Sequence, residues 1–410
     1  MKNGRILHLA INEKFIDHAY ISFENVAPGL NDFFIFFDEY HSYIQHTPYT
    51  AVRARDRLGL SLYKKIAAYD LVVVHSLHPF WISVINGCRQ DVTFVWVGWG
   101  YDYYDLIYPN SNAMLLPLTA QQLSHHKTVQ PKKPLQPRAL LCKLIEKLRL
   151  NQDKKAAISK MALFSPVIPT EYSLVKKACP QRPFPAALQW NYGSLEEVLL
   201  KGFIDRQICG KNILLGNSAS ASCNHLDILS WLADSATLQG QQVICPLSYG
   251  DSRYAANIKL AGKQLLPGYF QALTQFMPLS QYLDLVSSCS HLIMNHVRQQ
   301  GVGNILIMLY LGAMVFLREE NPCYDYFRQQ GFVLYSVQQL QQQPELLQQQ
   351  LSETARQNNR SLLFGIWSKQ VLDRRTAELI SRARALSQTD RTATAAVALR
   401  QPDKSTEPRR

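Results

Sequence analysis

The sequence predicts an α/β protein built from two doubly wound, Rossmann-like domains. Its 410 residues are 47% hydrophobic, and single cores stop growing at roughly 250–300 residues, so two cores are expected. Short β-rich runs alternate with helical stretches, and this alternation starts again in the second half, as parallel sheets with helices on both faces require. A polar, proline-containing stretch from Pro180 to Gly193 separates the two series, which is typical of an interdomain crossover.

The first domain is expected over residues 1–194. Five apolar runs are its candidate strands, each followed by a polar or glycine-containing connection: Ile6–Ala10, Phe33–Phe37, Leu71–His75, Val92–Val97 and Ala162–Phe164.

A basic insertion interrupts this domain at about 119–160. Leu141, Leu144, Ile145 and Leu148 recur there at helical spacing, and lysines such as Lys143, Lys147 and Lys154 surround them. This pattern is typical of a helix lying in a membrane interface. An ordinary surface helix packed on the first domain is the alternative.

The second domain is expected over residues 195–365, followed by a C-terminal helix at 366–385. Residues 386–410 have too few large apolar side chains to order themselves, so a disordered tail is expected. The candidate strands of the second domain are Ile213–Leu215, Val243–Cys245, Leu292–Asn295, Val315–Leu317 and Phe332–Leu334.

Composition narrows the function classes. The longest apolar runs are too short for a bilayer crossing, and the N-terminus has no secretory signal pattern. The eight cysteines form no close pairs, so neither a zinc motif nor a disulfide framework is indicated. The net charge of +12 favours an anionic partner, which could be nucleic acid, an anionic membrane or a phosphorylated substrate.

Ligands of open parallel sheets bind beyond the carboxyl ends of the strands, so the turns there are the candidate sites. In the second domain, Gly216, Asn217 and Ser218 follow a buried strand and precede a helix starting near Asn224 and His225. Glycine allows close approach to a ligand, and a helix N-terminus attracts anions. A plain N-capped helix would explain the same residues.

A second turn carries Arg298, Gln299, Gln300, Gly301 and Gly303 before an apolar helix. An arginine beside a helix start can hold a diphosphate. An ordinary tight turn that carries a surface arginine is the alternative.

A third turn, in the first domain, contains Trp99, Gly100 and Asp102. Its aromatic residues could flank a sugar ring, and Asp102 could act as a general base. His75 ends a nearby strand, where a structural histidine is the alternative. Packing alone also explains an aromatic turn.

These turns resemble glycosyltransferase family 56, whose enterobacterial-common-antigen enzymes transfer 4-acetamido-4,6-dideoxy-D-galactose from its dTDP derivative to lipid II. The resemblance rests on Leu215–Ser218 with Asn224 and His225 downstream, on Arg298–Gly303, and on Arg318–Pro322. In the first half, Trp99–Asp102 is similar to the family's Trp-Gly-x-Asp. The likeness covers about 65–110 and 210–335, and the region around Tyr249 matches only loosely.

The resemblance implies the GT-B fold, in which two facing Rossmann-like domains enclose a cleft, and a reaction with no metal and no cofactor. The second domain would hold the donor and the first the acceptor. The implied diphosphate ligands are Arg298 and the amides around Gly301 and Gly303, with Gly216, Asn217 and Ser218 for phosphate or sugar. Tyr249 or Tyr282 would lie near the nucleobase, and Glu320 and Asn321 near ribose or sugar hydroxyls. Asp102 or His75 would act as the general base on the acceptor. Further implied site residues are Asn224, His225, Gln299, Gln300 and Asn304 on the donor side, and Trp99 and Gly100 in the acceptor cleft.

The implied acceptor is a polyprenyl-pyrophosphate-linked oligosaccharide, so peripheral contact with an anionic membrane is expected, at the cytoplasmic face of the bacterial inner membrane. Nucleic acid is not expected as a partner, because the aromatic residues gather at strand ends and no nucleic-acid motif is present. The alternatives are a GT-B transferase of an O-antigen or capsule pathway that uses another nucleotide sugar, and a non-catalytic nucleotide- or carbohydrate-binding protein.

Overall fold

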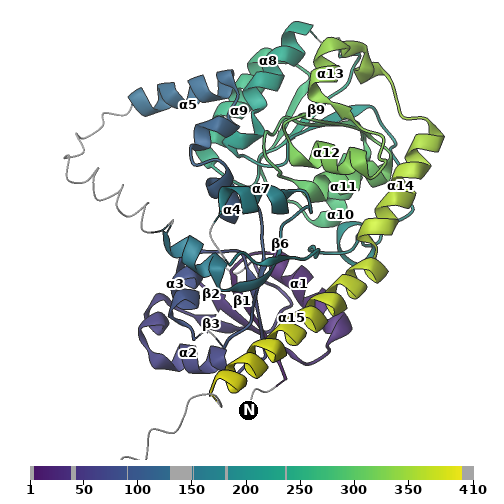
Figure 1. Ribbon diagram of the computed structural model, residues 1–410. Coiled ribbons are helices and arrows are strands. Elements are labelled where there is room, and N and C mark those ends of the chain that lie inside the picture. The colour runs from purple at the N-terminus through teal and green to yellow at the C-terminus, as the bar shows by residue number, and fades with distance from the viewer. Residues whose placement is uncertain are drawn as a thin grey trace, which may run out of the picture.

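The computed structural model describes residues 4–37, 43–89, 91–129, 150, 152–180, 183–235 and 238–398. It contains two parallel sheets, each with helices on both faces, one above the other in Figure 1. The predicted fold class is therefore confirmed.

The N-terminal sheet has seven strands in the order β3-β2-β1-β4-β5-β6-β7, and every described pairing in it is parallel. All five predicted strands are present, with ends shifted by one or two residues. The short edge strands β3 and β7 were not predicted, because their few residues are mostly exposed and carry no apolar run. The strands are β1 (Ile6–Ile11), β2 (Asn31–Phe36), β3 (Thr50–Val52), β4 (Leu71–His75), β5 (Phe94–Val97), β6 (Met161–Ser165) and β7 (Ala186–Ala187).

Helices connect these strands and cover both faces of the sheet. They are α1 (Phe15–Val26), η1 (Ala54–Leu58), α2 (Leu60–Ala67), α3 (Pro79–Gly87), α4 (Tyr101–Ile107), η2 (Ser111–Met114), α5 (Pro117–Val129), α7 (Glu171–Ala178) and η3 (Leu195–Leu199).

The C-terminal sheet has six strands in the order β10-β9-β8-β11-β12-β13. Four of the five predicted strands are confirmed. The fifth was placed at Phe332–Leu334, but the pairing with β12 forms at Tyr335 and Ser336, since Phe332 and Leu334 are buried in the neighbouring core instead. The strands are β8 (Asn212–Leu215), β9 (Val243–Pro246), β10 (Phe270–Leu273), β11 (Cys289–Met294), β12 (Met314–Leu317) and β13 (Tyr335–Ser336).

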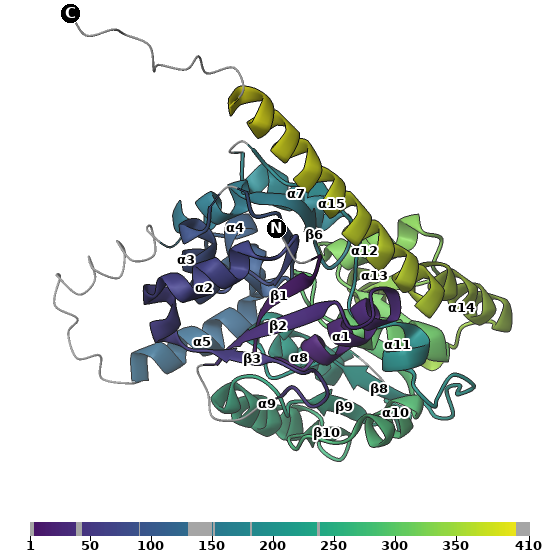
Figure 2. The same ribbon diagram turned by 90° about the horizontal axis from the view of Figure 1, so that it is seen from below.

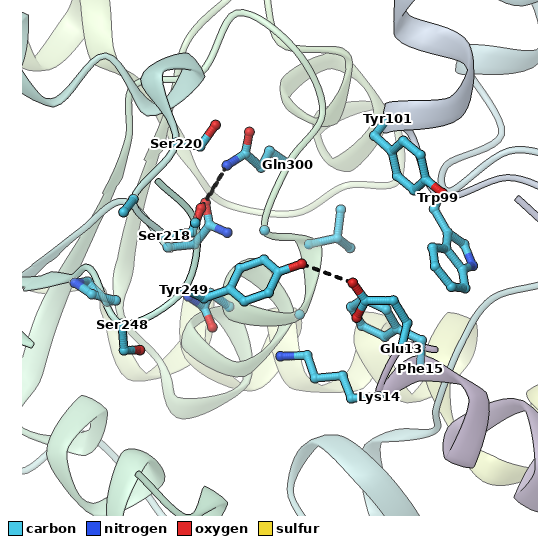
Figure 3. A pocket seen from close by; sticks show the side chains of 18 of the residues that line it. Glu13, Lys14, Phe15, Trp99, Tyr101, Ser218, Ser220, Ser248, Tyr249 and Gln300 are labelled. Atoms are coloured by element: carbon cyan, nitrogen blue, oxygen red, sulfur yellow. Dashed lines mark hydrogen bonds between the residues drawn. The ribbon is translucent and has the colours of Figure 1, made fainter. Parts of the chain in front are cut away.

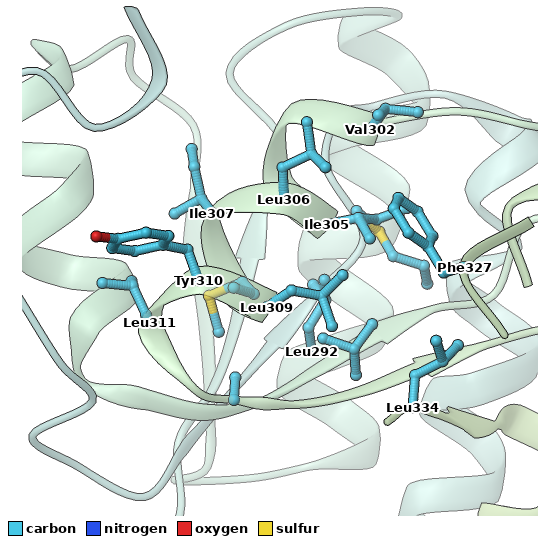
Figure 4. Packing of buried hydrophobic residues seen from close by; sticks show 14 of the residues in the cluster. Leu292, Val302, Ile305, Leu306, Ile307, Leu309, Tyr310, Leu311, Phe327 and Leu334 are labelled. Atoms are coloured by element: carbon cyan, nitrogen blue, oxygen red, sulfur yellow. The ribbon is translucent and has the colours of Figure 1, made fainter. Parts of the chain in front are cut away.

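The helices of this domain are η4 (Ala221–Cys223), α8 (His225–Ser235), α9 (Ser252–Leu265), α10 (Leu279–Ser287), α11 (Val302–Leu311), α12 (Pro322–Gln329), α13 (Val337–Gln342), η5 (Pro344–Gln348) and α14 (Glu353–Trp367). Helix α11 is apolar all round and lies in the largest core cluster, where Ile305, Leu309 and Leu292 are buried (Figure 4). Packing on every side fixes the start of α11, which faces the space between the domains.

The last helix, α15 (Lys369–Ala398), leaves the C-terminal domain and packs along the N-terminal one (Figure 1). Leu372, Leu379 and Ile380 are buried in a cluster with strands of the first sheet. Helix α15 continues to Ala398, past the predicted helix limit of residue 385 and the predicted start of disorder at 386. Residues 369–398 contain no proline or glycine that would end it. Residues 399–410 lie outside the described part.

One part of the predicted insertion at 119–160 packs on the C-terminal domain and another part on the N-terminal domain. Helix α5 packs on α8, where the Asp227 carboxylate accepts hydrogen bonds from the Leu118 and Thr119 amides at 2.9 and 3.0 Å. Leu141–Leu148, with Lys143 and Lys147, lies outside the described residues. Lys154 does not supply surface charge as expected, because its ammonium is buried and donates to Asp105 at 2.6 Å.

Candidate active site

A cavity of about 2110 Å3 lies between the carboxyl edges of the two sheets and takes its walls from both domains. Ligand pockets usually measure ~300–1,000 Å3, so this one has room for two substrates. Figure 3 shows Glu13, Lys14, Trp99 and Tyr101 on the N-terminal side, facing Ser218 and Tyr249 across it.

The two turns predicted in the C-terminal domain meet in this cavity. The Gln300 amide nitrogen donates to Asn217 Oδ1 at 3.1 Å and to Ser218 Oγ at 3.2 Å, and its oxygen accepts from Ser222 Oγ at 2.6 Å. Gly216 has a positive φ of 68° and carries the turn directly over His225. The structure thus joins residues that are some eighty positions apart in sequence.

Arg298 and the N-terminus of α11 form the cationic part of the wall. Gly301, in the left-handed conformation with φ 65°, caps α11, and Val302, Gly303 and Asn304 line the cavity. The Arg298 guanidinium lies 5.6 Å from the Tyr104 ring and donates to the Gln299 carbonyl at 3.1 Å. No ion pair joins it to a carboxylate of the described residues. Burial lowers the pKa of Arg298, yet guanidinium groups stay protonated in proteins, so a positive charge without an ion-pair partner among the described residues faces the cleft.

Asn321 and Glu320 do not face the cavity, contrary to expectation. The Asn321 amide nitrogen donates to the carbonyls of His296 and Arg298 at 3.2 and 2.9 Å, and its oxygen caps α12 by accepting from the Cys323 amide. Asn321 therefore supports the Arg298 turn from behind. Glu320 is held by Arg318 and by the Gln338 amide, which donates at 2.8 Å.

Asn224 and His225 are likewise buried supports and do not line the cavity, contrary to expectation. Asn224 Oδ1 accepts from the Leu116 amide at 2.8 Å, and its nitrogen donates to the Asn295 carbonyl at 3.1 Å. His225 packs beneath Gly216 beside the Tyr254 hydroxyl, and burial lowers its pKa to about 3. A histidine this difficult to protonate supplies no charge for a phosphate.

The predicted base Asp102 is only 2% exposed and does not line the cavity. Its carboxylate accepts from the amides of Leu77 and Trp99 at 2.9 and 2.8 Å, and from Trp96 Nε1 at 2.8 Å. Burial raises the pKa of Asp102, and these hydrogen bonds oppose that shift. Asp102 therefore ties the strand ends together and points away from the cavity.

His75 is also fully buried. Its ring nitrogens contact His8 Nδ1 at 2.9 Å and the Tyr192 hydroxyl at 2.6 Å, and burial holds its pKa well below the usual value. The alternative that His75 is structural is the correct one.

The carboxylate that does face the cavity from the N-terminal domain is Glu13, which directly follows β1. Its Oε1 accepts from the Tyr249 hydroxyl of the opposite domain at 3.0 Å (Figure 3). Lys14 Nζ lies 5.9 Å from the Tyr249 ring, and Tyr249 itself is 57% exposed. Sequence reasoning missed Glu13 and Lys14, although their place at a strand end was a usable signal.

Trp99, Tyr249 and Tyr282 line the cavity as expected, whereas Gly100 brings the two domains together beside it. A Cβ at Gly100 would lie 2.6 Å from Gln299 Oε1, and φ there is 93°. Across the same contact, the Gln299 amide donates to the Tyr104 hydroxyl at 2.8 Å. The Arg298 turn is therefore held in part by helix α4 of the N-terminal domain.

Behind Tyr104 lies Glu171, a fully buried carboxyl. Its Oε2 accepts from the Tyr103 hydroxyl at 2.6 Å and from the Ile168 amide at 3.2 Å. Burial raises the pKa of Glu171 to about 7, although the hydrogen bonds and the charge of Arg298 oppose the shift.

This shift predicts a pH effect on stability. Because the folded-state pKa exceeds the unfolded value of 4.5, the contribution of Glu171 is fully present below pH 4.5 and is lost as the pH rises through about 7. We expect Glu171→Gln to remove up to about 3 kcal/mol of this dependence. Thermal melts of both proteins between pH 4.5 and 8 measure it, and parallel curves would contradict the buried ionisation.

Residues 199–364 match the sequence model of glycosyltransferase group 56, which is described as 4-alpha-L-fucosyltransferase. The chain carries a family 56 glycosyltransferase domain. The family match spans the whole C-terminal sheet and both of its cavity turns.

Solved structures similar to this transferase are glycosyltransferases of the GT-B fold. HepE of Anabaena, in complex with UDP and glucose, has 10% identity and a TM-score of 0.59, with 92% of this chain and 99% of that chain covered. Sucrose-phosphate synthase of Thermosynechococcus elongatus has 9% identity and a TM-score of 0.66, with 94% and 100% covered. Trehalose 6-phosphate synthase of Burkholderia multivorans has 11% identity and a TM-score of 0.58, with 98% and 99% covered. At such identities the likeness shows the fold alone.

None of the helices within the described ranges of the transferase is long and apolar enough to cross a membrane.

Proposed function

We propose that this glycosyltransferase moves 4-acetamido-4,6-dideoxy-D-galactose from its dTDP derivative to undecaprenyl-pyrophosphate-linked lipid II, at the cytoplasmic face of the bacterial inner membrane. The observation that carries the donor side is the unpaired Arg298 guanidinium beside the N-terminus of α11 in the cavity wall. The family description names fucose, which, like the proposed sugar, is a 6-deoxyhexose of the galactose series.

In this proposal the C-terminal domain stabilises the leaving diphosphate. A charge-assisted guanidinium bond and the free amides of α11 would take up the negative charge that develops as the glycosidic bond breaks. Gly303 and Asn304 stand at that helix start, and the Gln300 amide keeps Asn217 and Ser218 in place next to it. Tyr249 and Tyr282 offer rings for the nucleobase at the cavity wall.

On the acceptor side we propose Glu13 as the general base. A sugar hydroxyl must lose its proton as it attacks, which requires a carboxylate or imidazole exposed to the cleft. Glu13 meets this condition from the domain opposite Arg298, whereas Asp102 and His75 are buried. His18 also lines the cavity, but burial lowers its pKa to about 4, which disfavours the imidazolium that proton transfer would create.

Donor class is tested by calorimetric titration of the protein with dTDP, UDP and GDP, followed by transfer from matched nucleotide sugars to a lipid-linked acceptor in detergent. We expect dTDP to bind most tightly and labelled sugar to move onto the lipid. Tighter binding of UDP or GDP would assign the enzyme to a pathway that uses another nucleotide sugar. Nucleotide binding without transfer to any acceptor would favour a binding protein.

A further inference from the structure

An exposed apolar pair interrupts the surface of the N-terminal domain between η1 and α2. Leu58 is 84% exposed and Leu60 is 75% exposed, on either side of Gly59. The next apolar residues of α2, Leu62 and Ile66, are buried in the core. Leu62 and Ile66 thus provide the packing of α2, while Leu58 at the end of η1 and Leu60 at the start of α2 remain in water at a cost in free energy.

Five exposed cationic side chains surround this pair, and residues 53–65 contain one acidic residue, Asp56. The Asp56 carboxylate is used locally, because it accepts from the Arg53 amide at 2.8 Å. None of the five forms an ion pair with a carboxylate of the described chain. We call these seven residues the leucine–arginine surface: Arg53, Arg55, Arg57, Leu58, Leu60, Lys64 and Lys65.

We propose that the leucine–arginine surface docks the enzyme on an anionic lipid membrane. The inference rests on the proposed lipid-linked acceptor and specifies how the enzyme reaches it. Exposed leucines gain free energy by entering the interface of a bilayer, and arginine and lysine are attracted by anionic headgroups. A nucleic acid would match the charge but would leave both leucines in water.

The position of this surface fits such docking. The segment that leads into it begins at the cavity, where Tyr43 and Gln45 form part of the wall, and continues through the exposed Tyr49 and strand β3. Tyrosine is a side chain favoured at membrane interfaces. Helices α2 and α3 lie together at one side of the N-terminal domain in Figure 2, and η1 contacts α3. Docking through this side holds the N-terminal half of the cavity at the lipid surface.

The test is flotation of the full-length protein with phosphatidylcholine vesicles that contain or lack phosphatidylglycerol, without donor or acceptor. One variant is Leu58→Ser with Leu60→Ser, and another is Arg53→Glu, Arg55→Glu and Arg57→Glu. The control changes exposed basic and leucine residues on α9, outside the cavity wall: Lys259→Glu, Leu260→Ser and Lys263→Glu. Circular dichroism and thermal melting verify that every variant is folded.

We expect the charge variant to bind anionic vesicles at least about a hundredfold more weakly, since each of its three arginines contributes about fivefold near the surface. The leucine variant should lose about tenfold on the same vesicles. The control should bind like the wild type. Unchanged flotation of both surface variants, or an equal loss in the control, would overturn the proposal. Because flotation uses no sugar nucleotide, failure of the donor assignment would not alter this result.

Discussion

Replacing Arg298 with alanine is expected to weaken nucleoside diphosphate binding by about 10- to 150-fold, equivalent to ~1.5–3 kcal/mol for a hydrogen bond to a charged group. The guanidinium is largely buried and forms no ion pair with a carboxylate of the described chain, so its charge is available to a diphosphate. The alanine variant loses this interaction. Transfer should fall at least as far, because the negative charge on the leaving group is greatest in the transition state. Calorimetry and initial rates measure the two effects.

Two further variants make this prediction specific. Arg298→Lys should bind with intermediate affinity, because lysine keeps the charge but loses the planar fork that matches two phosphate oxygens. Arg328→Ala removes an arginine that instead donates to the Tyr324 hydroxyl at 3.0 Å, outside the cavity wall, and should bind like the wild type. Equal affinity of Arg298→Ala and wild type would remove Arg298 from the donor site.

Replacing Glu13 with glutamine should lower kcat by about 10²- to 10⁴-fold, the usual contribution of a positioned general base. Glutamine retains an oxygen that can accept from the Tyr249 hydroxyl, so the interdomain contact at 3.0 Å is preserved while the base is lost. Donor affinity should therefore change little. Steady-state kinetics with varied donor, combined with nucleotide titration, separate the two parameters.

Tyr249→Phe is the matched variant, because it removes the hydrogen bond and leaves the carboxylate in the cavity. Its kcat should stay within about tenfold of the wild-type value, in line with the modest net energy of one hydrogen bond. If Glu13→Gln keeps its activity and His18→Asn loses it, the base is His18.

The sequence predicted the fold because the central strands are largely apolar. Apart from Asn212 at the start of β8, every residue of β4, β8, β11 and β12 is buried, and such runs stand out without other information. The edge strands β3 and β10 have exposed positions and are defined by the strand beside them, so their pattern is weak.

The donor-side turns were predictable for a related reason. Gly216 and Gly301 occupy positive-φ positions that favour glycine, and the glycines occur where strands meet helices. The direction in which a polar side chain points could not be predicted in this way, because it depends on packing. Asp102 stands at the correct strand end, yet it points back to the Leu77 amide. Glu13 also stands at a strand end, but its turn is plain and polar, and the contact with the Tyr249 hydroxyl of the opposite domain is what distinguishes it.

The crossing helix α15 has a mechanical consequence for substrate entry. Two of the segments that join the domains touch each other, because the Lys369 amide donates to Glu196 at 2.8 Å and its ammonium lies 3.7 Å from Glu197. Two chain segments held side by side in this way act as one hinge point. We therefore expect the cleft to open and close by a swing about the Glu196–Lys369 contact, with twisting resisted by the part of α15 that packs on the first sheet.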